Sequence, residues 1–133
     1  KATQTLPNVK HLSLQPLEKL NSLLNTADIH ILPQKANISD LVMPSKLPGM
    51  LASGRVVVAI ANPDTEIGRI ISQVGLVVSP QNTPGLRDAI LSLAASPHRR
   101  RFFGEQGRTY VCNNWSAEIV LPRFMEQLSK LME

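Results

Sequence analysis

The part of the sequence that decides the fold is a continuous apolar run, Val56-Val57-Val58-Ala59-Ile60-Ala61. Its residues do not alternate with polar ones, as they would in a strand with one face in solvent. A strand that is apolar throughout is typical of a parallel sheet covered by helices on both faces. The run therefore predicts a buried parallel strand at the centre of an α/β domain.

The segments on either side of this strand indicate the same architecture. Shorter apolar runs at 29–32 and 75–78 predict two more buried strands, and Val9 to Leu12 is interpreted as a fourth. Leucine and isoleucine at helical spacing predict helices between and after them, at 16–25, 44–54, 65–73 and in three stretches between 83 and 131. Regular alternation of strands and helices predicts a Rossmann-like, mostly parallel sheet with helices on both faces.

The composition indicates a globular protein and argues against several functions. The 133 residues are 43% hydrophobic and 18% charged, which suits one domain with a single core. No apolar run reaches the length of about 18 residues that a membrane span needs, and residues 1–7 lack the apolar block of a signal peptide. The single cysteine, Cys112, fits a reducing cytoplasm. No metal site is expected from Cys/His spacing, and with 4% aromatic residues no nucleic-acid partner is expected.

Ligands of open parallel sheets bind beyond the carboxyl ends of the strands. The segment from Pro33 to Ser45 is the richest candidate, because it runs directly into the start of a helix. The first N–H groups of a helix have no partner within it and favour a phosphate. Ser45 could add a hydroxyl donor and Lys46 a positive charge; the alternative is an ordinary helix start with both side chains in water.

Four further groups of residues have both a functional and a structural interpretation. Asp40 could bind a sugar hydroxyl or steady a turn, and Gln15 could read a base edge or lie on the surface. His30, inside a strand, is interpreted as a core histidine, and the basic run 98–101 as a solvated helix face. No Ser/His/Asp set, carboxylate pair or glycine-rich phosphate loop is found, so the catalytic residue is unknown.

Three stretches taken together resemble glycosyltransferase family 4. Residues 25–33 look like its Ala-Asp-strand-Pro segment, and residues 44–59, PSKLPGMLASGRVVVA, look like its PSKL-x-E-x-M-A-x-G-x-P-V-V-A motif. Residues 96–116 are similar to its Gly- and Arg-containing tail. The order and separation of the stretches carry the likeness, which runs from about Val9 to Leu131. The PSKL form most resembles the colanic-acid-type, exopolysaccharide subgroup of bacterial enzymes.

The resemblance implies a GT-B fold, in which two Rossmann-like domains face each other across a cleft. Residues 1–133 would then be part of the C-terminal, donor-binding domain, without the N-terminal acceptor domain and the first strand–helix units. It further implies retaining, metal-independent hexosyl transfer from a UDP- or GDP-sugar without a cofactor, in exopolysaccharide or cell-envelope glycan synthesis. The acceptor would be a glycan or lipid-linked molecule, reached through the N-terminal domain. The full-length enzyme would lie in the cytoplasm, in peripheral contact with the inner face of the membrane, and this part alone would be inactive.

The resemblance also assigns a nucleotide-sugar site. The residues implied are Asp40, Leu41, Val42, Met43, Ser45 and Lys46, with Gly49 near the ribose and Gln15 near the base. The family has two glutamates spaced E-x₇-E, and here those positions are Leu41 and Gly49. Two alternatives stay open: a non-catalytic α/β binding or interaction module, and a degenerate glycosyltransferase half, which the missing second carboxylate at Gly49 favours.

Overall fold

The sheet consists of three parallel strands in the order in which they occur in the sequence. The computed structural model describes residues 6–34 and 43–132. Within them, β1 (Ile29–Pro33) pairs with β2 (Val56–Ile60), and β2 pairs with β3 (Leu76–Val78). Ile29 lies opposite Val56, and Val58 lies opposite Leu76. The predicted parallel sheet is confirmed, with its strands at the expected positions.

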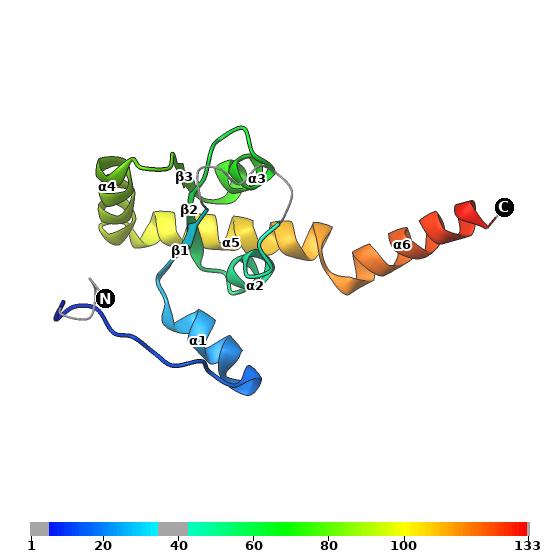
Figure 1. The fold of residues 1–133 in the computed structure, drawn as a ribbon, viewed down its shortest axis with the longest axis horizontal. Helices are drawn as coiled ribbons and strands as arrows, with labels where there is room; N and C mark the ends of the chain where they lie inside the picture. The colour runs from blue at the N-terminus through cyan, green and yellow to red at the C-terminus, as the bar shows by residue number, and fades with distance from the viewer. Residues whose placement is uncertain (1–5, 35–42, 133) are drawn as a thin grey trace.

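The helices alternate with the strands and then continue to the end of the chain (Figure 1). A short 3-10 helix, η1, and α1 precede β1, and α2 and α3 connect the strands, while α4, α5 and α6 follow β3. Their bounds are η1 Leu17–Lys19, α1 Leu20–Thr26, α2 Leu47–Ala52, α3 Glu66–Val74, α4 Thr83–Ala94, α5 Pro97–Asn114 and α6 Ala117–Leu131. Every predicted helix is present.

The fourth expected strand, at Val9 to Leu12, is wrong. The segment before η1 is irregular in its described part, from residue 6, and leads away from the sheet (Figure 1). Leu12 is 60% exposed and Leu14 is fully exposed. A strand forms only where a neighbour takes up its backbone hydrogen bonds, and no described strand lies beside this segment. The described sheet therefore has three strands.

The core lies on both faces of β2. Val56 and Val58 point to one face, where they pack with Leu93 of α4. Val57 and Ala59 point to the other face, where the core is completed by α2 and α3 through Leu47, Leu51, Ile67 and Ile71. All four β2 residues are completely buried. This arrangement confirms helices on both faces and explains why the strand is apolar throughout.

Helix α5 belongs to both layers, because it crosses the sheet at the start of β2. Its first half contributes Phe103 to the cluster on the α4 side, and its second half contributes Val111 to the cluster on the α2 side. Between them, Gly104 lies so close to the Gly54 carbonyl oxygen that no side chain fits there. Gly107, one turn later, lies against Leu51 of α2. The long helix therefore holds the two layers together.

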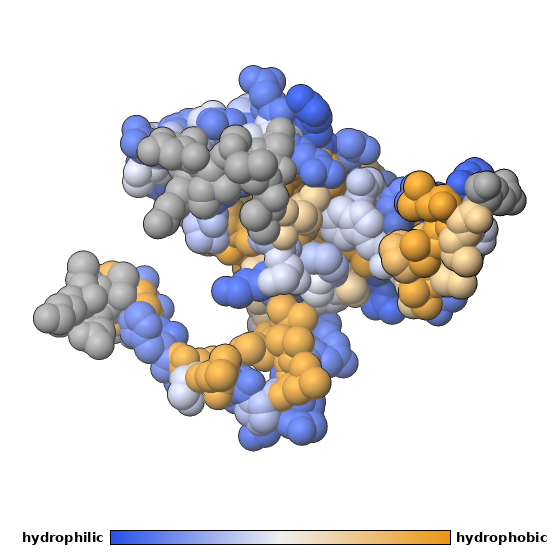
Figure 2. Space-filling model, turned by 45° about the vertical axis from the view of Figure 1, so that its right-hand side comes forward, coloured by the Kyte–Doolittle hydropathy of each residue, from blue (hydrophilic) through white to orange (hydrophobic). Residues whose placement is uncertain are grey.

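The first and last helices lie largely outside the core. Neither α1 nor α6 contains a buried residue. Apolar surface gathers on both (Figure 2), and on α6 it includes Val120, Leu121, Phe124 and Met125. Of the helices in the described part of the chain, none is long and apolar enough to cross a membrane.

Replacing Gly104 by alanine is expected to destabilise the protein strongly. The added methyl group would overlap the Gly54 carbonyl oxygen, so α5 would have to move away from the sheet. Overpacking of this kind costs about 1–3 kcal/mol, and backbone contacts give way less than side chains do. The measurement is the free energy of unfolding in urea, followed by circular dichroism.

The matched control is Gly49→Ala in α2. A methyl group there would lie 3.4 Å from Leu24 Cδ1, an ordinary contact. Alanine in place of glycine inside a helix stabilises it by about 0.5–1 kcal/mol. We therefore expect Gly49→Ala to be neutral or stabilising. Equal stabilities of the two variants would contradict the close crossing of α5 over β2.

Candidate functional site

At the carboxyl edge of the sheet, backbone hydrogen bonds between neighbouring chain segments continue past the ends of the strands. The Gln34 N–H donates to the Ile60 carbonyl at 2.9 Å, and the Ala61 N–H donates to the Val78 carbonyl at 3.0 Å. The chain therefore leaves all three strands at one edge. In open parallel sheets this is the edge where ligands bind.

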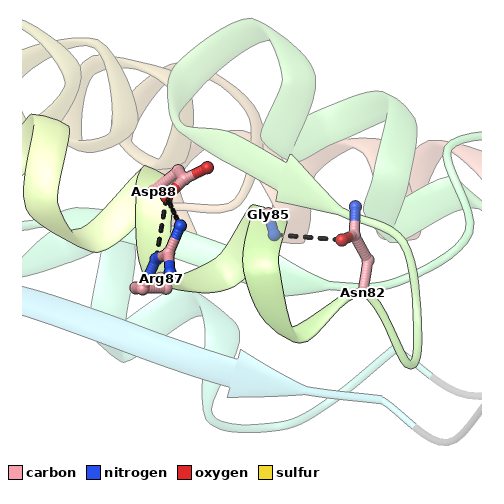
Figure 3. A network of polar contacts seen from close by, with 4 residues as sticks. All are labelled: Asn82, Gly85, Arg87 and Asp88. Atoms are coloured by element: carbon pink, nitrogen blue, oxygen red, sulfur yellow. Dashed lines mark hydrogen bonds and ion pairs between the residues drawn. The ribbon is translucent and has the colours of Figure 1, made fainter.

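Three helices begin near this edge, and in two of them the N-cap side chain accepts a hydrogen bond from a backbone N–H of the first turn. At the start of α3, the Thr65 hydroxyl accepts a hydrogen bond from the Gly68 N–H at 3.1 Å. At the start of α4, Asn82 Oδ1 accepts from the Gly85 N–H at 3.0 Å (Figure 3). Such caps satisfy N–H groups that would otherwise be available to an anion.

The start of α2 lacks a cap of this kind. Its N-cap is Lys46, whose side chain makes no capping hydrogen bond. The Leu47 N–H donates to the Pro44 carbonyl at 2.9 Å, and Pro48 has no N–H to offer. Ser45 and Lys46 are both exposed. Ser45 and Lys46 therefore place a hydroxyl and an ammonium group beside this helix start.

Of the other predicted residues of this loop, Met43 is among the described residues. Met43 is partly buried and packs against the core cluster beneath α2, so its side chain anchors the end of the loop. Asp40, Leu41 and Val42 lie outside the described residues. Their assignment to the sugar–diphosphate site stays a prediction.

Gly49 lies where α2 contacts α1. A side chain at this position would first meet Leu24 of α1. Gly49 also lines a hollow of about 520 Å³ between the two helices, together with Asn25, Ser53 and Arg108, and Ser45 and Lys46 are not among its lining residues. Its expected place near a ribose stays a prediction.

Gln15 lies in the segment before η1. Its side-chain amide donates to the Ser13 carbonyl at 3.0 Å. With Leu12, Lys19 and Leu23 it lines a shallow hollow that contains none of the other predicted site residues. The described structure thus does not bring Gln15 together with Ser45 and Lys46 in one cavity, and its contact with a base stays a prediction.

A hollow at the carboxyl ends of β2 and β3 contains none of the predicted site residues. It has a volume of about 80 Å³ and is lined by residues of the two strand ends and of the α4 start: Ile60, Val78, Ser79, Gln81, Asn82, Thr83 and Leu86. Gln81 adopts a left-handed backbone with φ 67°. The only signal in the sequence was the polar run after Val78, which is typical of any turn. Beside the hollow, the first turns of α4 carry an exposed ion pair between Arg87 and Asp88 at 2.9 Å (Figure 3).

His30 is a core residue with partners, as expected. Its Nε2 lies 3.2 Å from the Ser53 hydroxyl, and only 8% of its surface is exposed. Burial lowers the pKa of His30 below 6.5, a hydrogen bond to the backbone of Leu24 opposes this shift, and the nearby Arg55 adds to it. The neutral ring therefore joins β1 to α1 and to the end of α2. In the part of the chain that the structure describes, no three His, Cys, Asp or Glu side chains are grouped so that they could hold a metal ion.

Comparison with curated proteins finds a relative among bacterial enzymes. Over 93 residues the chain is 33% identical to the "Putative colanic acid biosynthesis glycosyl transferase WcaI" of Escherichia coli (strain K12). The chain is related to a glycosyltransferase. The aligned stretch covers 65% of this chain and 23% of the relative, so the chain spans less than a quarter of that protein's length. No protein-family model and no solved structure matches the chain.

The lowered pKa of His30 predicts a pH-dependent stability. The unfolded chain binds a proton near the ordinary pKa of 6.5, whereas the folded chain resists protonation until a lower pH. Stability is therefore full above about pH 7 and falls as the pH is lowered through about 6.5. We expect the denaturant concentration at the unfolding midpoint of the wild type to decrease as the pH is lowered through this range. The dependence of this midpoint on pH should be weaker in His30→Gln.

The control for this prediction is His98→Gln, which removes an exposed histidine at the start of α5. In His98→Gln, the unfolding midpoint should depend on pH as it does in the wild type. Chemical denaturation at a series of pH values measures all three proteins. A midpoint of His30→Gln that depends on pH as strongly as that of the wild type would show that His30 is not the group responsible.

Proposed function

We propose that the chain forms the donor-binding part of a glycosyltransferase and holds a UDP- or GDP-sugar at the carboxyl edge of its sheet. The proposal extends to a GT-B enzyme that transfers a hexosyl group with retention of configuration and without a metal ion or cofactor. The acceptor is a glycan or lipid-linked molecule of exopolysaccharide or cell-envelope synthesis. The enzyme works in the cytoplasm, in peripheral contact with the membrane. The relationship to a glycosyltransferase supports the class of reaction.

The start of α2 is the observation that supports the position of the site. Thr65 caps the start of α3 and Asn82 caps the start of α4 through side-chain hydrogen bonds. At the start of α2, the N-cap residue Lys46 makes no such bond. An uncapped helix start beside a hydroxyl and an ammonium group suits a diphosphate. Lys46 and Ser45 hold the phosphates in this proposal, and the loop Asp40 to Met43 contacts the sugar.

A second candidate is a glycosyltransferase-like half that has lost donor binding and serves in assembly. The glycine at position 49 favours it, because a residue without a side chain on the side of α2 that faces α1 offers no carboxylate to a ribose. The two candidates differ in a property that can be measured, namely affinity for a nucleotide sugar.

We expect calorimetric titration with a panel of UDP- and GDP-sugars to detect binding to at least one of them. Lys46→Ala should weaken that binding about tenfold or more, because a charge-assisted hydrogen bond to phosphate contributes about 1.5–3 kcal/mol. The site is exposed, so higher ionic strength should also weaken binding.

Lys10→Ala is the matched control. Lys10 is an exposed lysine in the irregular segment before η1, so its loss changes the net charge equally. It should leave the affinity unchanged. If no nucleotide sugar binds the wild type, the second candidate is favoured; if Lys46→Ala and Lys10→Ala bind equally, the assignment of the site to the α2 start is wrong.

A further inference from the structure

A second, basic cavity lies at the opposite end of the sheet from the proposed donor site. It has a volume of about 220 Å³ and is lined by residues that precede β1 and β2 and by the start of α5: Asp28, Gly54, Arg55, Pro97, Arg100 and Arg101. Three guanidinium groups and one carboxylate give this arginine pocket a formal charge of +2. Like charges around one cavity repel each other unless an anion lies between them.

Two of the arginines are fixed in place by backbone carbonyl groups. Arg100 Nη1 donates to the carbonyls of Leu93 and Ala94 at 2.6 and 2.8 Å, where α4 ends. Arg55 Nη2 donates to the Asn25 carbonyl at 3.1 Å, near the end of α1. Each guanidinium group has five N–H donors, so most remain for a ligand. A ligand would therefore meet groups that are already oriented, which lowers the entropy cost of binding.

No ion pair between described residues involves an arginine of the pocket. Among the described residues, the ion pairs are those of Arg87 with Asp88 and of Lys130 with Glu126, and neither involves a pocket arginine. Asp28 lines the pocket but lies beyond ion-pair distance of the three arginines. The amino end of α5, at Pro97, adds the positive end of a helix dipole to the same cavity.

We propose that the arginine pocket binds a phosphate group, either a phosphate monoester or a diphosphate. The dianion of a phosphate monoester matches the formal charge of +2, a diphosphate adds further negative charge, and guanidinium groups suit the oxygens of a tetrahedral phosphate. Sites for drug-sized ligands have volumes of about 300–1,000 Å³, so this cavity suits a terminal phosphate better than a whole nucleotide sugar. The site lies at the amino ends of the strands and is independent of the proposed donor site.

Calorimetric titration with inorganic diphosphate tests the proposal. Arg101→Gln is the informative variant, because Arg101 is exposed and caps no helix, so the fold is expected to survive. It should weaken binding about tenfold or more, which corresponds to the loss of a charge-assisted hydrogen bond. Asp28→Asn, which removes the carboxylate from the pocket, should tighten binding several-fold.

Two controls separate this site from general charge effects and from the donor site. Arg69→Gln removes one positive charge from the exposed side of α3 and should change the affinity less than twofold. Lys46→Ala should also leave diphosphate binding in the arginine pocket unchanged. Loss of donor binding in Lys46→Ala with this binding retained would separate the two proposals.

Vesicles distinguish a soluble phosphate from a lipid head group. One set contains phosphatidic acid in phosphatidylcholine, and the other contains phosphatidylcholine alone. Recruitment to the first set that is lost in Arg101→Gln identifies a lipid phosphate, and diphosphate binding without recruitment identifies a soluble one; either result supports the site. The proposal is overturned if neither ligand binds, or if Arg101→Gln and Arg69→Gln behave alike.

Discussion

The close crossing of α5 over the start of β2 is the contact on which the rest of the structure depends. Because Gly104 has no side chain, an 18-residue helix can lie directly against the Gly54 carbonyl. Its two halves then cover different faces of the sheet, with Phe103 in one cluster and Val111 in the other. A bulkier residue at this crossing would separate α5 from the sheet and open both layers of the core.

The order of the elements gives the two ends of the sheet different chemistry. Helices that follow parallel strands begin at the carboxyl edge, so α2, α3 and α4 bring their amino ends there. Helix α5 is the exception, because it follows α4 without a strand between them and therefore begins at the amino edge. Because α5 begins at this edge, Arg100 and Arg101 line the same cavity as Arg55. The carboxyl edge thus offers the uncapped start of α2 to an anion, whereas the amino edge offers guanidinium groups.

The chain is related to a glycosyltransferase and has the predicted α/β architecture, but the predicted site is only partly assembled in the described chain. Ser45 and Lys46 lie together at an uncapped helix start. Gly49 faces Leu24, and Gln15 lies in a separate hollow. The described core is complete without α1 and α6, which contribute no buried residue and carry much of the exposed apolar surface (Figure 2).

The sequence by itself determined the parallel sheet, its three strands, every helix and the helix start at Ser45 and Lys46, because each follows from local periodicity, turns and caps. Only the tertiary structure decided that Val9 to Leu12 is not a strand, since a strand requires a neighbour that periodicity does not supply. It also decided that Gly49 faces α1 and that Arg55 joins Arg101 in one cavity. These are contacts between residues far apart in the chain, and local sequence patterns carry no information about which distant residues meet.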